Sequence, residues 1–215
     1  MIISKGEPWI LWPEKYSHGL CKNDLNKSLQ GNNDFTIGID FKLLTKGPDK
    51  RTIFSRLPNY LGLDIEKENN NVLFICKTKK GEEEKAYYEF SDFSLDDSFY
   101  RFYIRYNKKN NFLDVSIDGK VIIEVNFDKN EELLQSKDSH IIFGSGNFPH
   151  NGFNLNYSEL DIKQFFVSEK FLDLKKFDTK ELLDLSCVGI YDFENKTDYQ
   201  IWDYTENYNL IGKIL

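Results

Sequence analysis

Apolar and polar residues alternate along much of this chain, with a period of two that is typical of β-strands buried on one face. The clearest case is FTIGIDFKL at 35–43, where every odd-numbered position is apolar and the even-numbered positions hold Thr, Gly, Asp and Lys. Similar alternation predicts strands at 51–56, 60–67, 71–78 and 99–107. One face of each strand is therefore expected to meet a core.

The segment FLDVSIDGKVIIEVNF at 112–127 predicts a β-hairpin whose register depends on the length of its Asp-Gly loop. A two-residue loop would place the carboxylate of Glu124 opposite the core residue Leu113. A three-residue loop that ends with Gly119 in the left-handed region places Ile123 opposite Leu113 instead. We predict the three-residue loop because it keeps the core side of the hairpin apolar.

The chain gives only one clear helix signal. Asp178 is followed three residues later by Glu181, which has the form of a capping box before an apolar pair, and this predicts a short helix from about Thr179 to Leu185. Many short strands with almost no helix indicate a β-sandwich or barrel. With 215 residues, the chain can bury one sizeable core or at most two small ones, and we expect residues 1–215 to form a single domain.

Charge and composition narrow the function classes. The net charge is −7 and the lysines are mixed with acidic residues, so no basic stripe is available for nucleic acid. The chain shows no apolar leader and no run near the roughly 18 apolar residues of a membrane span. The cysteines Cys21, Cys76 and Cys187 lack C-x-x-C spacing, so neither a disulfide framework nor a zinc site is indicated. We expect a cytoplasmic protein that binds neither nucleic acid nor membranes.

Several segments resemble, in order, the concanavalin A-like lectin/glucanase superfamily, and within it the laminin G-like domains. NDFTIGIDFKL resembles the opening strand of such domains, RTIFSRLPNYLGLDI the following pair, and SFYRFYIRYNKKNNFLDVSIDGKVI the central hairpin. HIIFGSG and SELDIKQFFVSEKFLDLKKFDTKELL resemble the late strands and the closing helix. The resemblance covers roughly 33–185 and implies an all-β, jelly-roll β-sandwich of two antiparallel sheets.

The C-terminal segment 188–215 departs from the order of these domains. It resembles the segment that normally begins them, yet here it comes last. One reading is that it completes the sandwich beside the N-terminal segment, as in a permuted domain, and the other is that it starts a further module. We favour the first reading because the termini of sandwich domains usually lie close together.

The glucan-cleaving members of this superfamily use two carboxylates on one strand, spaced E-x-D-x-E, or E-x-D-x-x-E where the strand bulges. A retaining mechanism needs its two carboxyl groups about 5–5.5 Å apart, which this spacing provides. Glu159 and Asp161 fit the start of the pattern, but Lys163 and Gln164 occupy the two positions where the second glutamate would stand. We therefore predict that the chain is not an enzyme.

The resemblance instead implies a lectin-like, carbohydrate-binding module within a larger protein, with a protein-interaction or architectural module as the alternative. A sugar site needs an aromatic plate together with carboxylate, amide or guanidinium groups. Such residues occur near the N-terminus, on the outward face of predicted strands that also carries Arg105, and in the loop 144–156. The candidate ligand-binding residues are Trp9, Trp12, Tyr60, Asp64, Arg101, Tyr103, Asn147, His150, Asn151 and Asn154.

No organic cofactor is expected. Calcium stays open, because many relatives of this fold bind it through clustered oxygen ligands. The clusters Asn32-Asn33-Asp34 and Asp96-Asp97 are the candidate positions, although each is too short to specify a site alone. The expected partner is thus a carbohydrate or a protein.

Overall fold

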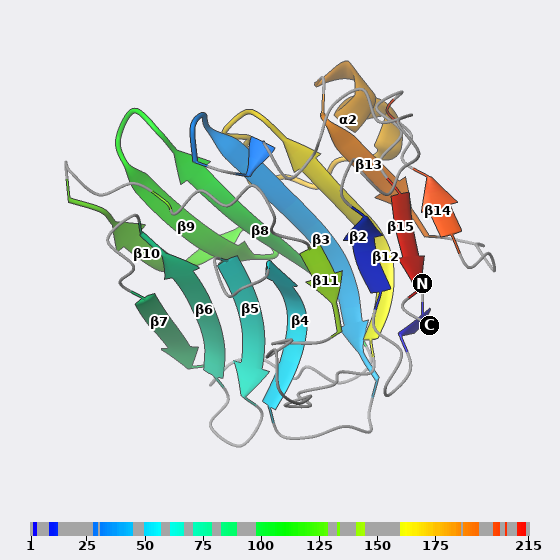
Figure 1. Ribbon diagram of the computed structural model, residues 1–215, viewed down its shortest axis with the longest axis horizontal. Helices are drawn as coiled ribbons and strands as arrows, with labels where there is room; N and C mark the ends of the chain where they lie inside the picture. Colours follow the sequence, from blue (N-terminus) through cyan, green and yellow to red (C-terminus); the bar gives the residue numbers. More distant parts are fainter. Residues whose placement is uncertain are drawn as a thin grey trace.

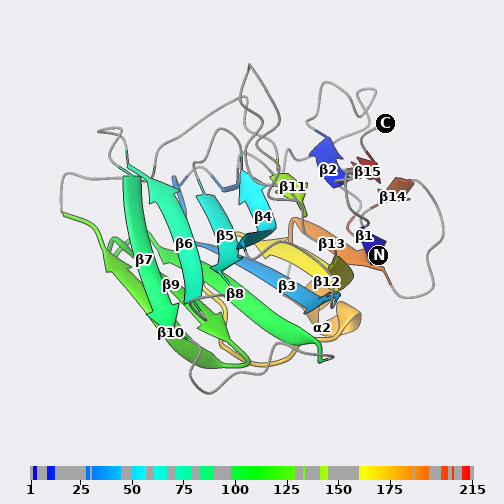
Figure 2. The ribbon, with the colours of Figure 1, turned by 90° about the horizontal axis from the view of Figure 1, so that it is seen from below.

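The computed structural model describes the greater part of the sandwich, and these residues form two antiparallel sheets stacked face to face (Figures 1 and 2). The described residues are 2–3, 9–12, 28–29, 31–44, 50–56, 61–66, 71–78, 83–89, 98–128, 133, 141–144, 160–185, 187–193, 200–202, 205 and 210–213. The prediction of an all-β sandwich of two antiparallel sheets is confirmed.

The first sheet contains seven of the described strands. In spatial order they are β1 (Ile2–Ile3), β12 (Leu160–Ser168), β3 (Phe35–Leu43), β8 (Tyr100–Asn107), β9 (Phe112–Ile117) and β10 (Lys120–Asn126), with β13 (Gly189–Asp192) also paired to β12.

The second sheet contains eight of the described strands. Their order is β14 (Gln200–Trp202), β15 (Leu210–Lys213), β2 (Trp9–Trp12), β11 (Ile141–Phe143), β4 (Lys50–Arg56), β5 (Leu61–Glu66), β6 (Asn71–Lys77) and β7 (Glu83–Glu89).

The core lies between the two sheets and is built largely from aromatic and β-branched side chains. The odd-numbered residues of β3 all face it, as the alternation predicts. Phe165 of the seven-stranded sheet meets Phe143 of the eight-stranded sheet, with ring centroids 4.9 Å apart. Because each fully buried Phe contributes roughly 1.5–3 kcal/mol, these rings hold the two sheets together.

The β9–β10 hairpin corrects our predicted register. Its loop has two residues, Asp118 and Gly119, with φ of 47° and 86°, and Ile117 lies opposite Lys120. A bulge at Ile122 then shifts the strand by one residue, so that Val125 lies opposite Leu113. The prediction of a three-residue loop is therefore wrong. A two-residue loop is compatible with an apolar core side here because the bulge restores the apolar pairing that the tight loop alone would break.

The predicted helix is confirmed as α2 (Thr179–Asp184), with Asp178 as its N-cap and Leu185 as its C-cap. The Asp178 carboxylate accepts the Glu181 backbone N–H at 2.8 Å, and the Glu181 carboxylate accepts the Asp178 backbone N–H at 3.0 Å. Among the described residues, no helix is long and apolar enough to cross a membrane.

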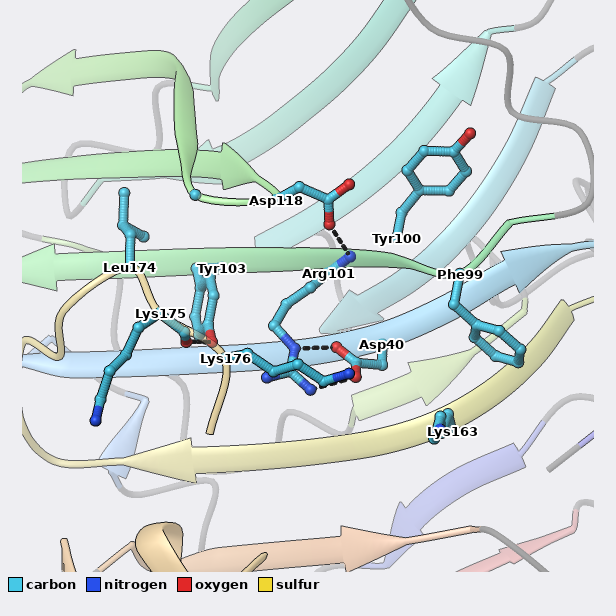
Figure 3. Close-up of a pocket in the computed structure, with 11 residues that line it drawn as sticks. Asp40, Phe99, Tyr100, Arg101, Tyr103, Asp118, Lys163, Leu174, Lys175 and Lys176 are labelled. Carbon is cyan, nitrogen blue, oxygen red and sulfur yellow. Dashed lines mark hydrogen bonds and ion pairs between the residues drawn. The ribbon is translucent and has the colours of Figure 1, made fainter. Parts of the chain in front are cut away.

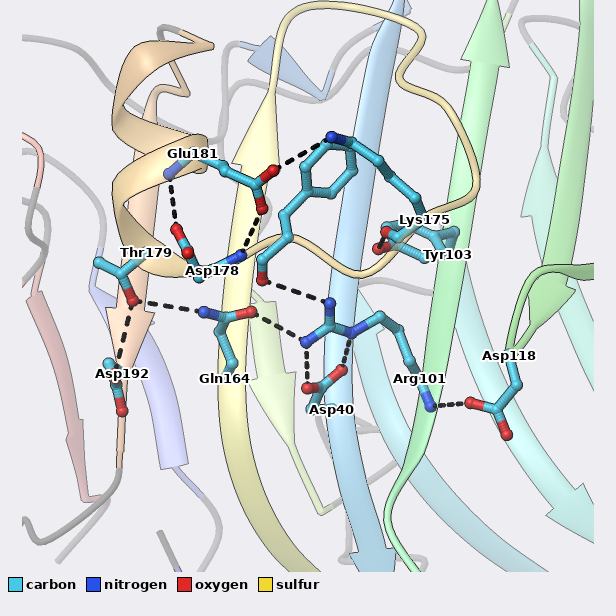
Figure 4. A network of polar contacts seen from close by, with 11 residues as sticks. Asp40, Arg101, Tyr103, Asp118, Gln164, Lys175, Asp178, Thr179, Glu181 and Asp192 are labelled. Atoms are coloured by element: carbon cyan, nitrogen blue, oxygen red, sulfur yellow. Dashed lines mark hydrogen bonds and ion pairs between the residues drawn. The ribbon is translucent and has the colours of Figure 1, made fainter.

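The segment between β12 and α2 folds back over the outer face of the seven-stranded sheet. We call residues 169–178 the strap. Two of its apolar side chains, Leu172 and Phe177, join a second buried cluster with Tyr103, Phe166 and others on that face. The outer face of this sheet is therefore covered here (Figure 4).

Described parts of the C-terminal segment contribute to both sheets. β13 pairs with β12, β15 pairs with β2, and β14 pairs with β15. The strand that follows α2 and the strand beside the N-terminal β2 thus both come from 188–215 (Figure 1). The division of the chain into domains stays a prediction.

Candidate ligand-binding pocket

A cavity of about 290 Å³ opens beside the strap, on the outer face of the seven-stranded sheet (Figure 3). Residues of β3, β8 and β12 line it from the sheet, the β9–β10 turn lines one side, and residues 174–176 of the strap line another. Residues from five separate parts of the chain therefore converge on this cavity.

The floor of the pocket is an ion pair between Arg101 of β8 and Asp40 of β3, which lie directly opposite each other in register. Both side chains are buried, and Asp40 accepts hydrogen bonds from Nε and Nη2 of Arg101. Nη2 also donates to Oε1 of Gln164 at 3.2 Å, and Nη1 donates to the carbonyl of Phe177 at 3.4 Å (Figure 4). Hydrogen bonds to three residues thus hold the guanidinium in the pocket floor.

This environment keeps Arg101 charged. Burial acts to lower the pKa of Arg101, yet the hydrogen bonds and the charge of Asp40 together raise that pKa above its usual value. A buried pair of this kind is costly to break because the partner that remains would be an uncompensated charge.

Tyr103 forms the second polar link between the sheet and the strap. Its ring is buried against Phe166, with centroids 6.0 Å apart, and its hydroxyl donates to the carbonyl of Lys175. Burial raises the pKa of Tyr103 to about 12, although the neighbouring Arg101 opposes this effect. The phenol therefore keeps its proton and remains a donor.

Arg105 of β8, paired with Asp114 of the neighbouring strand β9, forms a third link between the sheet and the strap. Asp114 accepts from Nε of Arg105 at 2.9 Å and from Nη2 at 2.6 Å. Nη1 donates to the carbonyl of Leu172 at 2.7 Å, and the guanidinium lies 4.2 Å from the ring centroid of Phe171. Side chains of β8 thus hold the strap at three of its carbonyls, which makes the adjacent pocket wall a fixed one.

These contacts correct one of our predictions. Arg101, Tyr103 and Arg105 do point away from the core, as expected, but the expectation that they line an exposed face is wrong because the strap covers them. Arg101 and Tyr103 still line the pocket, whereas Arg105 does not. Their part in ligand binding stays a prediction.

The open side of the pocket carries different chemistry. Phe99, directly before β8, is 45% exposed, and its ring is an apolar surface at the pocket edge. Asp118, in the β9–β10 turn, accepts the backbone N–H of Arg101 at 2.9 Å through one oxygen, and its side chain is exposed. Lys163 of β12 and Lys176 of the strap add ammonium groups (Figure 3). An aromatic plate thus lies beside both acceptors and donors.

Three other predicted site residues, Asp64, Trp9 and Trp12, lie in strands of the eight-stranded sheet, whereas the pocket lies on the seven-stranded one. Asp64 lies in β5 of the eight-stranded sheet, so the expectation that it shares a face with Arg101 is wrong. Trp9 and Trp12 are the first and last residues of β2, a strand that is paired on both sides, to β11 and β15. Five other candidates lie outside the described residues, and their role stays a prediction: Tyr60, Asn147, His150, Asn151 and Asn154.

The strand with the glucanase-like spacing is bulged. The register of β12 against β3 shifts at Lys163, so Asp161 lies opposite Lys42 and Gln164 lies opposite Asp40, on the outer face. The bulged form of the pattern is therefore the relevant one, and its second carboxylate is replaced by the amide of Gln164. Oε1 of that amide accepts a hydrogen bond from Arg101, and its Nε2 donates to the Thr179 hydroxyl at 3.5 Å. Glu159 lies outside the described residues.

Among the described residues, no group of three or more His, Cys, Asp or Glu side chains could hold a metal ion. Asp34, one calcium candidate, accepts the backbone N–H of Lys108 at 2.7 Å, while Asp96 and Asp97 lie outside these ranges. Calcium binding stays a prediction. Burial raises the pKa of the Cys187 thiol to about 11, so this thiol is protonated at neutral pH.

Several residues that line the pocket were not among the ligand-binding residues predicted from the sequence, namely Asp40, Phe99, Asp118, Lys163 and Lys176. A signal was present for Phe99, because in the alternation of 99–107 it shares the outward face with Arg101 and Tyr103. An aromatic residue at the start of an otherwise polar face is a candidate plate. The lysines carried no comparable signal, since the bulge and the strap path that place them are tertiary features.

No known family model matches this sequence, and no curated protein matches it. Solved structures do match its fold. The Ruminococcus gnavus IT-sialidase CBM40 bound to α2,3-sialyllactose is 14% identical, with a TM-score of 0.60 over 81% of this chain and 91% of that chain. The SAP-like pentraxin from Limulus polyphemus is 10% identical, with a TM-score of 0.50 over 79% of this chain and 73% of that chain.

The botulinum neurotoxin serotype D binding domain is 14% identical, with a TM-score of 0.52 over 81% of this chain. Our chain spans only 40% of the length of that toxin chain. At such identities these likenesses show the fold alone. The chain has the jelly-roll β-sandwich fold that it shares with these structures.

Proposed function

We propose that this chain is a non-catalytic carbohydrate-binding module of the concanavalin A-like, laminin G-like type, and that it forms one part of a longer protein. The observation that carries the proposal is the pocket beside the strap, where the exposed ring of Phe99 lies with Asp118 and lysine side chains. Neighbours in fold that include a sialidase CBM40 solved with sialyllactose support it.

The chemistry of the pocket suits a sugar ring. The C–H groups on one face of a pyranose pack on an aromatic plate such as Phe99, while the hydroxyls need acceptors and donors. Asp118 supplies an acceptor, and Lys163 and Lys176 supply donors. Because the strap is bonded to β8 at three carbonyls, the pocket is largely pre-organised, which lowers the cost of binding.

The proposal of a binding module over a hydrolase is supported by Gln164. A retaining hydrolase needs two carboxylates, and the resemblance to the glucan-cleaving enzymes implies that the second would stand at this position of the bulged strand; an amide can neither protonate a leaving group nor attack a sugar. The Gln164 side chain instead stabilises Arg101 in the pocket floor. Binding without bond cleavage is the chemistry that these groups support.

The test is a glycan array followed by calorimetric titration of the saccharides that bind. Phe99→Ala is expected to weaken binding at least about fivefold, since aromatic anchors at binding sites are worth roughly 1 kcal/mol or more. Leu183→Ala is the matched control, because Leu183 is also 45% exposed but lies on α2, outside the pocket lining. It should leave the affinity unchanged.

Absence of binding to any saccharide would overturn the proposal. If a protein partner were captured in the same experiments, and its binding were weakened by Phe99→Ala, the alternative of a protein-interaction module would replace it. Equal loss of sugar binding in the Phe99→Ala and Leu183→Ala variants would place the sugar site elsewhere on the molecule.

A further inference from the structure

The β9–β10 turn is joined to β8 by a reciprocal pair of hydrogen bonds at Arg101. The backbone N–H of Arg101 donates to Oδ1 of Asp118 at 2.9 Å, and the backbone N–H of Asp118 donates to the Arg101 carbonyl at 2.9 Å (Figure 3). The side chain of Arg101 is itself held by Asp40, Gln164 and the strap. The Asp118 carboxylate is therefore fixed relative to the pocket floor.

The same turn also approaches the strap closely. Gly119 has a φ of 86°, and a methyl group added to it would lie 3.4 Å from the Leu174 carbonyl oxygen. Gly119 and Leu174 both line the pocket. The backbone that carries Asp118 is thus confined between β8 and the strap, so the position of this carboxylate is set before any ligand binds.

The turn uses only one of the two carboxylate oxygens of Asp118. Asp118 and Gly119 both have positive φ, as in a type I′ turn, and Asn-Gly fits such a turn as well as Asp-Gly does. An asparagine would also supply the one acceptor that the Arg101 N–H needs. Asp118 is exposed, and its Oδ2 has no hydrogen-bond partner among the described residues. The local fold therefore requires neither the second oxygen nor its charge.

This second oxygen lies in the same pocket as the exposed ring of Phe99. Phe99 precedes Arg101 by two residues, which is about 7 Å along an extended chain. Because Asp118 is bonded to the backbone of Arg101, the aromatic plate and the carboxylate are separated by roughly the width of one sugar ring with its hydroxyls. The two groups can thus contact the same ring.

We propose that Asp118 is a specificity-determining residue of this pocket, which selects saccharides that present a free hydroxyl to the β9–β10 turn. This inference rests on the proposed carbohydrate-binding function. A carboxylate oxygen only accepts hydrogen bonds, so the group that faces it must donate a hydrogen. A sugar that carries a carboxylate, a sulfate or an ether at that position has no such hydrogen and is rejected. Arg101 is the positioning residue, because its backbone holds Asp118.

The experiment titrates the full chain, by calorimetry, with the methyl α-glycosides of mannose and glucose and the methyl β-glycoside of galactose. Between them, these probes present the hydroxyls at C2 and C4 in both orientations. The mono-deoxy derivatives of each glycoside that binds then remove one hydroxyl at a time. One derivative should bind at least about tenfold more weakly than its parent, because it loses a hydrogen bond to a charged group. The O-methyl ether at the same carbon should bind no better, since it keeps the oxygen without the hydrogen.

Asp118→Asn keeps the acceptor for the Arg101 N–H and replaces the second oxygen with a donor. It should weaken binding of the parent glycoside about threefold to tenfold, and the penalty for removing the hydroxyl should fall below about threefold. The melting temperature should change by less than about 2 °C. The variant is used fresh and its mass is checked, because Asn-Gly sequences slowly revert to an acid.

Asp173→Asn is the matched control, because Asp173 is an exposed aspartate of the strap outside the pocket lining. It removes the same charge nearby and should change neither the affinity nor the penalty for the missing hydroxyl. An effect equal to that of Asp118→Asn would overturn the assignment, since it would show a general response to charge.

The other outcomes separate this inference from the proposed function. Equal hydroxyl penalties in the native protein and in Asp118→Asn would overturn the role of Asp118 and leave carbohydrate binding standing. So would glycan binding on an array with no binding of the three glycosides. A fall in melting temperature of more than about 5 °C for Asp118→Asn would show that the turn does need the second oxygen, which would also overturn the assignment. Failure of every saccharide to bind would overturn both proposals together.

Discussion

Both faces of β3 and β8 are buried, but the interactions on the two faces differ in kind. On the inner face, rings such as Phe41 and Phe102, whose centroids lie 5.3 Å apart, pack in a largely apolar core. On the outer face, Asp40 and Arg101 lie directly opposite each other in the register of β3 and β8 and meet as ions, and side chains of β8 bond to carbonyls of the strap.

This difference has a consequence for function. The free energy gained by burying apolar side chains is roughly proportional to the buried area and does not depend on direction. Charge-assisted hydrogen bonds, in contrast, fix the distance and direction between two groups. The inner face therefore supplies most of the stability, and the outer face sets the position of the strap. Because residues 174–176 of the strap form one wall of the pocket, the outer face also sets the geometry of the candidate site.

The comparison is tested most strongly by Phe165→Ala on the inner face. Phe165 is fully buried and packs against Phe143 and Tyr191, with centroids at 4.9 and 5.7 Å. The cavity left between the sheets should lower the free energy of unfolding by about 3–5 kcal/mol, measured by urea denaturation. Phe99→Ala is the control for the loss of an exposed ring and should cost little. A loss below that of the outer-face variants would reverse the assignment of stability to the inner face.

Asp114→Ala tests the outer face and should cost about 3 kcal/mol, since it leaves the buried Arg105 without its counter-ion. The cost lies at the low end of the usual range because Arg105 keeps the Leu172 carbonyl and the Phe171 ring.

The double variant Arg105→Met with Asp114→Leu sharpens this test. It should be within about 1 kcal/mol of the native protein, because it removes both charges together. If the double variant were as unstable as Asp114→Ala, the pair would be a net source of stability instead of a device that positions the strap.

The sequence predicted the inner face well and the outer face poorly. Alternation in 35–43 is a local signal, and the capping box of Asp178 and Glu181 involves only neighbouring residues, so both were readable. The bulges at Ile122 and Lys163 were not, because an inserted residue changes the pairing without changing the composition.

The burial of the outer face was partly visible in the sequence. Phe165, Phe166 and Val167 form a continuous apolar run, which is the pattern of a strand buried on both faces. Leu172 and Phe177, which follow in the strap, belong to the same buried cluster as Phe166. The path of the strap itself has no period, so its position over β8 could not be predicted from the sequence alone.

A smaller effect is expected at Gly38 of β3, which lies directly opposite Phe166 of β12. A methyl group at Gly38 would lie 2.1 Å from Cε1 of Phe166, whose ring is buried against Phe177 and Tyr103. Gly38→Ala should therefore cost about 1–3 kcal/mol through overpacking, measured by thermal unfolding.

Gly62→Ala on β5 is the matched control, because among the described residues its methyl group would meet only the Phe54 carbonyl, at 3.8 Å. It should be close to neutral. In the double variant Gly38→Ala with Phe166→Leu, the smaller side chain should recover part of the loss. Equal losses at Gly38 and Gly62 would show that the Phe166 ring moves aside without cost.

The smallest effect concerns pH at the end of the strap. The bond from the Asp178 backbone N–H, and then the Lys175 ammonium, lower the pKa of Glu181 below its ordinary 4.5. A carboxyl whose pKa is lower in the folded state stabilises the fold above the unfolded pKa, and this contribution is lost as the pH falls through the folded pKa. The small advantage in melting temperature of the native protein over Glu181→Gln should thus be present at pH 7, begin to decline near pH 4.5 and be lost as the pH falls through the lower pKa of the folded state. Since Glu181 is exposed, a difference that persisted unchanged to pH 3 would mean that hydrogen bonding through the neutral side chain, and not the charge, holds the strap to α2.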